Sequence, residues 1–172
     1  MILPDKSPLS RKRRRKLQHD SDRDRVTRNV AEGRLDRLLA RARSRLKRLR
    51  PSAAWKAIQK GAILVDIRPE FQRRADGEIP GAIVIERNHL EWRLHPGSAG
   101  RIPEARDAAT QWIVICDEGY ASSLAAAALQ AIGLRRSTDV VGGFQAWRRA
   151  RLIVGPPGVV TPPRLSPPRR RR

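Results

Sequence analysis

The sequence predicts an α/β domain with an open parallel sheet of about four to five strands and helices on both faces. Short apolar runs rich in β-branched residues alternate with segments of helix-forming residues between positions 51 and 154. The clearest run is Trp-Ile-Val-Ile at 112–115, which is apolar at every position, as expected of a strand buried on both faces. Strand–helix alternation at this spacing predicts right-handed crossovers between parallel strands.

The other elements follow in chain order from the same patterns. Residues 34–50 carry leucines at helical spacing and predict a basic amphipathic helix, and Leu49-Arg50 at its end is also a candidate for a short edge strand. Ser52 is a candidate N-cap for the next helix, which Gly61 ends. The remaining predictions are helices over 53–60, 70–76, 104–109, 124–132 and 144–150, and strands over 62–67, 82–85, 112–115 and 138–141.

The formal net charge of +20 is concentrated at the two ends of the chain. Residues 1–50 hold 18 Lys and Arg against 6 Asp and Glu, whereas residues 51–154 hold 14 against 11, and the rest holds 5 Arg and no acid. Segments without apolar residues to bury stay disordered. We therefore divide the chain into a basic disordered tail (1–33), the amphipathic helix (34–50), the α/β domain (51–154) and a Pro/Arg-rich disordered tail (155–172).

The basic ends of the chain allow two interpretations. They can bind an anionic partner, such as nucleic acid or a membrane surface, or they can be solvated tails, which we favour. The apolar stripe of residues 34–50 contains no aromatic residue, which disfavours binding to a membrane surface. We therefore expect its leucines to pack on the domain or on a second copy in a homo-oligomer. A single cysteine and the lack of long apolar runs predict a cytoplasmic protein without a transmembrane segment.

Cys116 is the only cysteine and lies between the strand over 112–115 and the helix over 124–132. Ligands bind at the carboxyl ends of parallel strands, and the free N–H groups of a helix N-terminus stabilise a thiolate. Gly119 lets the loop turn, and Ser122 or the adjacent Ser123 can cap the helix. The loop thus predicts a nucleophilic sulfur in a cup of amide groups, suited to holding a persulfide. The alternative is an inert core cysteine.

Four motifs resemble, in the same order, those of the rhodanese-like sulfurtransferase family. The pattern Cys-x-x-Gly-x-x-Ser at 116–122 resembles the active-site loop of that family. Val-Asp-Ile-Arg-Pro at 65–69 resembles the signature of its first strand. Gly-Glu-Ile-Pro-Gly-Ala at 77–82 resembles its Gly-His-Ile-Pro-Gly-Ala motif, with Glu78 in place of His, and Gly-Gly-Phe-Gln-Ala-Trp at 142–147 resembles its closing motif.

The resemblance covers about residues 52–154 and implies a rhodanese-like fold and a sulfurtransferase activity. Sulfane sulfur would pass from a persulfide, polysulfide or thiosulfate donor to a thiol or cyanide acceptor through a Cys116 persulfide. Because no second cysteine exists, the acceptor must be external, and no cofactor or metal is expected. The resemblance gives Asp66 and Arg68 a supporting role below the site. The predicted substrate-binding residues are Asp117, Glu118, Gly119, Tyr120, Ala121, Ser122 and Arg87, the last being equally a surface cation.

Asp117 and Glu118 depart from family loops that favour thiosulfate, which often carry a basic residue here. Two carboxylates repel a dianion, so a persulfide or polysulfide is expected to be the better donor. A cysteine phosphatase is disfavoured, because Ser122 stands where the Cys-x5-Arg motif needs arginine. The main alternative is a non-catalytic rhodanese-like module that binds a partner or senses redox state, with the basic ends as its working parts.

Overall fold

The computed structural model describes residues 33–158 of the 172-residue chain. The chain divides into two compact units, the first ending at Ala40 and the second beginning at Arg41. Residues 33–40 of the first unit are helical, as are residues 41–43 at the start of the second. Within the described residues, no helix has the length and apolar character needed to cross a bilayer. The predictions made for residues 1–32 and 159–172 fall outside the described part.

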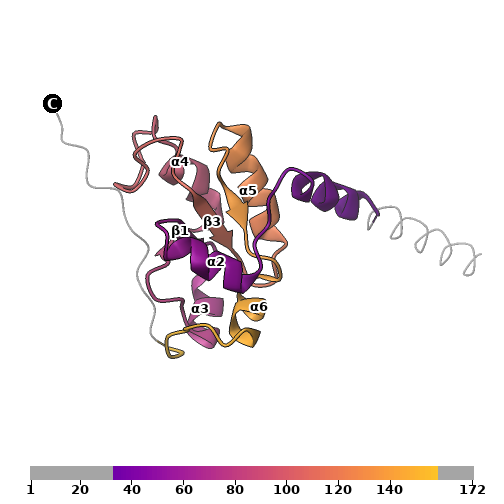
Figure 1. Cartoon of the computed structure of the whole chain (residues 1–172), viewed down its shortest axis with the longest axis vertical. Helices are drawn as coiled ribbons and strands as arrows, with labels where there is room; N and C mark the ends of the chain where they lie inside the picture. The colour runs from indigo at the N-terminus through magenta and orange to yellow at the C-terminus, as the bar shows by residue number, and fades with distance from the viewer. Residues whose placement is uncertain (1–32, 159–172) are drawn as a thin grey trace, which may run out of the picture. The chain divides into compact units, whose positions relative to one another are not determined.

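The second unit is built on a parallel sheet of four strands in the order β2-β1-β3-β4 (Figure 1). Each neighbouring pair of strands is parallel. An isolated parallel bridge between Leu49 and Val140 extends the pairing beyond β4. The predicted α/β class and open parallel sheet are confirmed. The strands are β1 (Ile63–Asp66), β2 (Ile83–Val84), β3 (Trp112–Ile115) and β4 (Thr138–Asp139).

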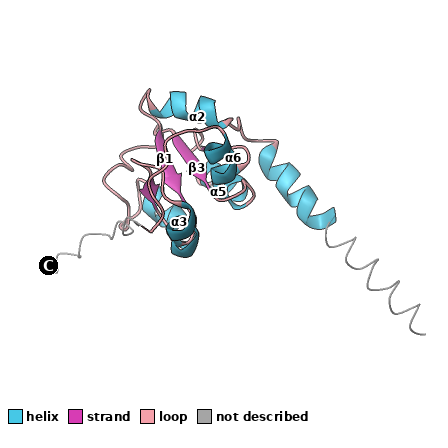
Figure 2. Cartoon of the chain, turned by 90° about the horizontal axis from the view of Figure 1, so that it is seen from below, coloured by secondary structure: helices cyan, strands magenta, loops and turns pink. Residues whose placement is uncertain are grey.

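Helices cover both faces of this sheet and bury two separate apolar cores (Figures 1 and 2). Alternate residues of a strand point to opposite faces, so Val114 joins one core while Ile113 and Ile115 join the other. All four residues of β3 are buried, as the apolar run predicts. The helices are α2 (Pro51–Ile58), α3 (Glu70–Asp76), η1 (Arg87–His89, a 3-10 helix), α4 (Leu90–Leu94), α5 (Ala121–Ala131) and α6 (Gly143–Arg149).

Outside the Cys116 loop and helix α5, three predictions about local structure are wrong. The helix predicted over 34–50 ends at residue 43, because Leu46 turns into the core and Leu49 pairs with Val140 in an extended conformation, which agrees with the edge strand predicted at Leu49. Residues 104–109 form turns and no helix. Helix α2 begins at Pro51, whose missing N–H suits a first helical position, so Ser52 is not its cap.

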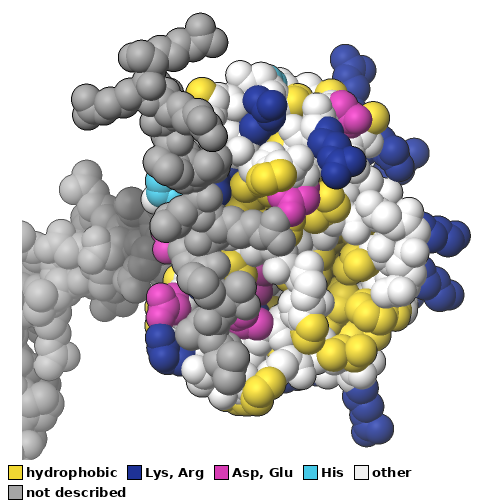
Figure 3. Space-filling view, turned by 90° about the vertical axis from the view of Figure 1, so that its left-hand side faces the viewer, with side chains coloured by type: hydrophobic (Ala, Val, Ile, Leu, Met, Phe, Trp, Pro, Cys, Tyr) yellow, Lys and Arg dark blue, Asp and Glu magenta, His cyan; other side chains and the backbone are white. Residues whose placement is uncertain are grey.

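The surface of the domain mixes cations with apolar side chains. On the face seen in Figure 3, Lys and Arg side chains stand around the edge and hydrophobic side chains gather between them. Phe71 and Trp92 are among the large hydrophobic residues that stay exposed. More than half of an ordinary protein surface is apolar, so single exposed side chains of this kind do not mark a binding surface.

Helix α6 begins against the backbone that follows β3. The N–H groups of Phe144 and Gln145 donate to the carbonyl oxygens of Cys116 (2.8 Å) and Asp117 (3.0 Å). Gly143 precedes them with φ +56°, and a Cβ atom there would lie 2.4 Å from the Asp117 carbonyl oxygen. The close approach of α6 to this loop therefore requires glycine at position 143.

We expect Gly143→Ala to lower the free energy of unfolding by at least about 3 kcal/mol, because overlap with backbone adds to the strain of a positive φ. Gly133→Ala is the matched control, since Gly133 has φ +98° but open space around a Cβ atom. Its loss should be about 1–2 kcal/mol, from conformation alone. Urea unfolding measures both variants, and equal losses would contradict the close contact between α6 and the loop.

Candidate active site

Cys116 follows β3 directly, and only 7% of its surface is exposed. Its Sγ atom accepts hydrogen bonds from the backbone N–H groups of Gly119 (3.2 Å) and Ser122 (3.3 Å). The thiol also donates to the Ser122 hydroxyl at 3.2 Å. The Ser122 N–H lies in the first turn of helix α5 (Ala121–Ala131), where N–H groups lack partners within the helix, and here the sulfur is its acceptor. The same donors stabilise negative charge on the sulfur.

The sulfur also explains why the predicted serine cap is wrong. Helix α5 begins at Ala121, with Tyr120 as its N-cap residue and no side-chain cap. The Ser122 N–H donates to Cys116, and the Ser123 hydroxyl approaches a carboxylate instead of a backbone N–H of the first turn. The helix consequently starts three residues earlier than predicted, and its first turn forms one wall of the site.

The two acidic residues of the loop have different surroundings. The Asp117 carboxylate accepts a 2.9 Å hydrogen bond from the side-chain amide of Gln145 on α6. Glu118 is exposed to solvent, as is Tyr120. Asp117 is therefore tied to the neighbouring helix, and Glu118 is the acid of the loop that an approaching anion would meet.

A buried carboxylate, Asp139 at the end of β4, lies beside the loop and was missed by the sequence analysis. Its Oδ2 atom is 2.7 Å from the Ser123 hydroxyl and 3.4 Å from the Ser122 hydroxyl. Arg48 binds it in a bidentate manner, with Nε 2.8 Å from Oδ1 and Nη2 2.9 Å from Oδ2. The rule that ligands meet the carboxyl ends of strands could have identified Asp139 as a candidate.

Two arginines from the segment before α2 reach the same loop. Arg43 donates to the Gly119 carbonyl at 2.9 Å and to the Ser123 hydroxyl at 3.2 Å. Its guanidinium also lies 5.5 Å from the centre of the Tyr120 ring. Arg48 is 3.3 Å from the same Gly119 carbonyl. The sequence offers no signal for either contact, because both arginines occur in a run of basic residues with helical spacing.

Asp66 and Arg68 form a buried ion pair, each about 1% exposed. Arg68 Nη2 lies 2.7 Å from the Asp66 carboxylate and 2.9 Å from the Gly77 carbonyl, and the guanidinium covers the Phe144 ring at 3.5 Å. These contacts join the end of β1 to the segment before β2 and to α6. Glu78, which replaces the histidine of the related motif, pairs with Arg73.

Arg87 is not brought to Cys116 by any hydrogen bond or ion pair within residues 33–158. It lies in η1, and its guanidinium pairs with the Glu91 carboxylate at 2.9 Å, one helical turn later. Its side chain is 39% exposed. These are the surroundings expected of a surface cation, and a role of Arg87 in binding substrate stays a prediction.

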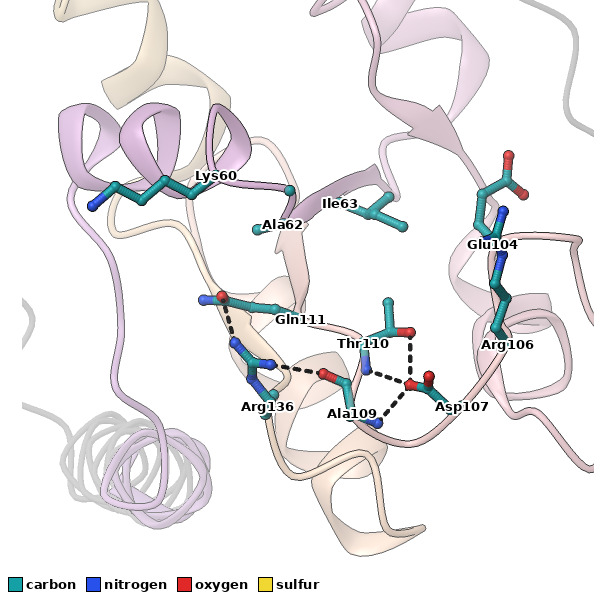
Figure 4. Close-up of a pocket in the computed structure, with 11 residues that line it drawn as sticks. Lys60, Ala62, Ile63, Glu104, Arg106, Asp107, Ala109, Thr110, Gln111 and Arg136 are labelled. Carbon is teal, nitrogen blue, oxygen red and sulfur yellow. Dashed lines mark hydrogen bonds between the residues drawn. The ribbon is translucent and has the colours of Figure 1, made fainter.

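A hollow of about 360 Å³ lies at the other end of the sheet (Figure 4). Its walls include Ile63, the first residue of β1, and Gln111, which directly precedes β3, whereas Cys116 follows the last residue of β3. Arg136 in its wall is bound to the Ala109 carbonyl (3.0 Å) and to the Gln111 side chain (3.3 Å). This hollow is therefore separate from the cysteine site.

The described residues contain no cluster of metal ligands. Across positions 33–158, no three His, Cys, Asp or Glu side chains gather closely enough to hold an ion. His89 ends η1, and the Nδ1 atom of His95 accepts a hydrogen bond from the Gly97 N–H at 3.1 Å.

Comparison with known proteins matches residues 50–150 to the family model described as a rhodanese-like domain. The thiosulfate sulfurtransferase GlpE of Haemophilus influenzae is 34% identical over 108 residues, which are 63% of this chain and 93% of that protein. The protein of the same name from Pseudomonas entomophila is 33% identical over 105 residues, covering 61% of this chain and 87% of that protein. The similarity thus includes nearly all of each relative.

Solved structures agree on the fold. The protein RPA3614 of Rhodopseudomonas palustris, described as of unknown function and a possible tyrosine phosphatase, is 30% identical with a TM-score of 0.64, and covers 70% of this chain and 93% of its own. The polysulfide-sulfur transferase homodimer of Wolinella succinogenes has a TM-score of 0.58 at 20% identity, over 72% of this chain and 88% of that one. The second likeness concerns the fold alone.

We expect Arg68→Met to lower the free energy of unfolding by about 3–5 kcal/mol, because it leaves the Asp66 carboxylate buried without its cation. The double variant Asp66→Asn, Arg68→Met should lose less, since no buried charge remains. Urea unfolding compares the two. A loss for Arg68→Met no larger than that of the double variant would contradict a structural role for the ion pair.

Proposed function

The chain belongs to the rhodanese-like domain family, and on this premise we propose that it is a sulfurtransferase with Cys116 as its nucleophile. The observation that carries the proposal is the pair of backbone N–H groups directed at the Cys116 sulfur. The relatives named thiosulfate sulfurtransferase support the same class of reaction.

In the first step the Cys116 thiolate attacks the sulfane sulfur of the donor. For an organic persulfide, R–S–SH, the donor S–S bond breaks, a new S–S bond forms on Cys116, and the thiolate R–S⁻ leaves. For thiosulfate the leaving group is sulfite. The Gly119 and Ser122 N–H groups, which hold the sulfur of the free enzyme, are placed to stabilise the negative charge of the resulting persulfide.

In the second step an external acceptor removes the terminal sulfur. Cyanide attacks that sulfur, the S–S bond breaks, thiocyanate leaves, and the Cys116 thiolate is restored. A thiol acceptor takes the sulfur as its own persulfide in the same way. An external acceptor is required because the chain has only one cysteine.

The likeness to a protein described as a possible tyrosine phosphatase does not favour phosphatase chemistry here. Such enzymes need an arginine six positions after the cysteine to bind the phosphoryl group, and this position holds Ser122. The Ser122 N–H and hydroxyl contact the sulfur. The alternative that we keep is a non-catalytic rhodanese-like module that binds a partner or senses redox state.

Intact mass spectrometry tests the persulfide directly. We expect a gain of one sulfur, about 32 Da, after exposure to a suitable donor and its loss after cyanide is added. Cys116→Ser should gain nothing. No adduct with either thiosulfate or glutathione persulfide, on protein shown to be folded, would refute the sulfurtransferase proposal and favour the non-catalytic module.

We further expect glutathione persulfide to load Cys116 about tenfold faster than thiosulfate, because thiosulfate carries two negative charges on the reacting group itself and Glu118 repels them, whereas the carboxylates of glutathione are remote from its sulfane sulfur. Glu118→Gln should accelerate loading by thiosulfate, and so lower the ratio of the glutathione persulfide rate to the thiosulfate rate several-fold. Glu104→Gln, at the hollow on the other end of the sheet, is the control and should leave the ratio unchanged. Equal or faster loading by thiosulfate in the unaltered protein would contradict this donor preference.

A further inference from the structure

Arg48 lies outside the residues that match the rhodanese-like family model, which begin at position 50. It is nevertheless part of the site, because its guanidinium binds both oxygens of Asp139 and approaches the Gly119 carbonyl. Its side chain is only 17% exposed, and Asp139 is fully buried. The geometry is a bidentate Arg–carboxylate pair, which combines charge with a fixed orientation.

We propose that Arg48 is a positioning residue for Cys116: by neutralising Asp139 and holding the Gly119 carbonyl, it lets the buried sulfur carry negative charge. Its part in sulfur transfer rests on the function proposed above. Its effect on the sulfur is independent of any donor, because the contacts join Arg48 to Cys116 through groups of the protein itself.

The first part of the argument concerns Asp139. The Ser122 hydroxyl lies 3.2 Å from the Cys116 sulfur and 3.4 Å from the Asp139 carboxylate, so it bridges the two groups. A buried carboxylate this near would oppose a thiolate or a persulfide anion, since charges interact strongly away from water. Arg48 removes that opposition, and no other cation within residues 33–158 forms an ion pair with Asp139.

The second part concerns the peptide that joins Gly119 to Tyr120. Arg48 and Arg43 both donate to the carbonyl oxygen of this peptide, at 3.3 and 2.9 Å. A trans peptide is planar, so directing its carbonyl towards the arginines directs its N–H, on Tyr120, away from them. The two arginines therefore hold the orientation of this peptide, and Arg48 also neutralises the Asp139 carboxylate.

Other charged groups around the sulfur must be considered in any test of its ionisation. The Asp117 carboxylate is bound to the Gln145 side chain, and Glu118 is exposed to solvent. Arg43, beside Ser123, adds a second positive charge. None of these groups changes in the variants described next.

The test is the pH dependence of Cys116 alkylation by iodoacetamide, a neutral reagent that needs no sulfur donor. We expect Arg48→Met to raise the pH of half-maximal alkylation by about one unit, and so to slow alkylation about tenfold below it. Asp139→Asn should move the midpoint in the opposite direction, because it leaves Arg48 without its anion. The double variant Arg48→Met, Asp139→Asn should return close to the unaltered protein, because both charges are removed and Arg43 still donates to the Gly119 carbonyl at 2.9 Å.

Arg45→Met is the matched control, because Arg45 lies in the same segment and none of its side-chain hydrogen bonds within the described residues reaches the Cys116 loop. Its midpoint should stay unchanged. If Arg48→Met does not fold, Arg48→Lys and the double variant decide the question: both should keep the midpoint of the unaltered protein, Lys by preserving the charge and the double variant by removing both charges.

Opposite shifts of the alkylation midpoint in Arg48→Met and Asp139→Asn support the proposal. If the Arg48–Asp139 pair only held the loop in place, both variants would loosen the loop and shift the midpoint in the same direction. Equal shifts, no shift, or a midpoint in Arg48→Lys or the double variant that differs from the unaltered protein would overturn it. If the expected alkylation shifts occur but no donor loads Cys116, the sulfurtransferase proposal fails and the effect of Arg48 on the sulfur stands.

Discussion

Two backbone N–H groups directed at one sulfur atom are the interaction on which the rest of this site depends. Those of Gly119 and Ser122 can meet the Cys116 sulfur only if the chain turns back on itself directly after β3. The turn needs the positive φ of Gly119, and the loop is then held from outside by α6. A loop of so few residues is thus rigid enough to present both donors to a reacting sulfur.

The charge of Asp139 beside the loop is balanced by the charge of Arg48. The buried Asp139 carboxylate opposes negative charge on the nearby sulfur, and it accepts hydrogen bonds from the Ser122 and Ser123 hydroxyls. Arg48 makes that arrangement compatible with an anionic sulfur. The segment before α2 therefore contributes to the site as well as to the core, where Leu46 packs against the same side of the sheet as Cys116.

The sequence analysis succeeded where short-range pattern determines structure. The apolar run 112–115 correctly predicted a central buried strand, and Cys116 with its loop was correctly placed between a strand and a helix. Prediction failed where a distant contact outweighs local preference. Serine is a good capping residue, but neither Ser122 nor Ser123 caps the helix. The Ser122 N–H donates to the Cys116 sulfur, and the Ser123 hydroxyl donates to the Asp139 carboxylate.

The residues from 34 to 50 show the same limit. Their leucines fit one helical stripe, yet the helix ends at residue 43 because Leu46 and Leu49 each gain more by joining the domain in non-helical conformations. Helical spacing is a property of neighbouring residues, whereas the position of Arg48 beside Asp139 joins residues 91 positions apart. No local pattern can encode such a pairing.

The sequence by itself determined the class of fold, the position of Cys116 between a strand and a helix, and the amide-rich loop around it, because strand periodicity, glycine conformation and the site at the strand end are local or topological properties. Only the tertiary structure decided which charges surround the sulfur. It turned Asp117 towards Gln145, left Arg87 with Glu91, and brought Arg43 and Arg48 to the loop. Charge acts through space, and the chain had to fold before distant residues could meet.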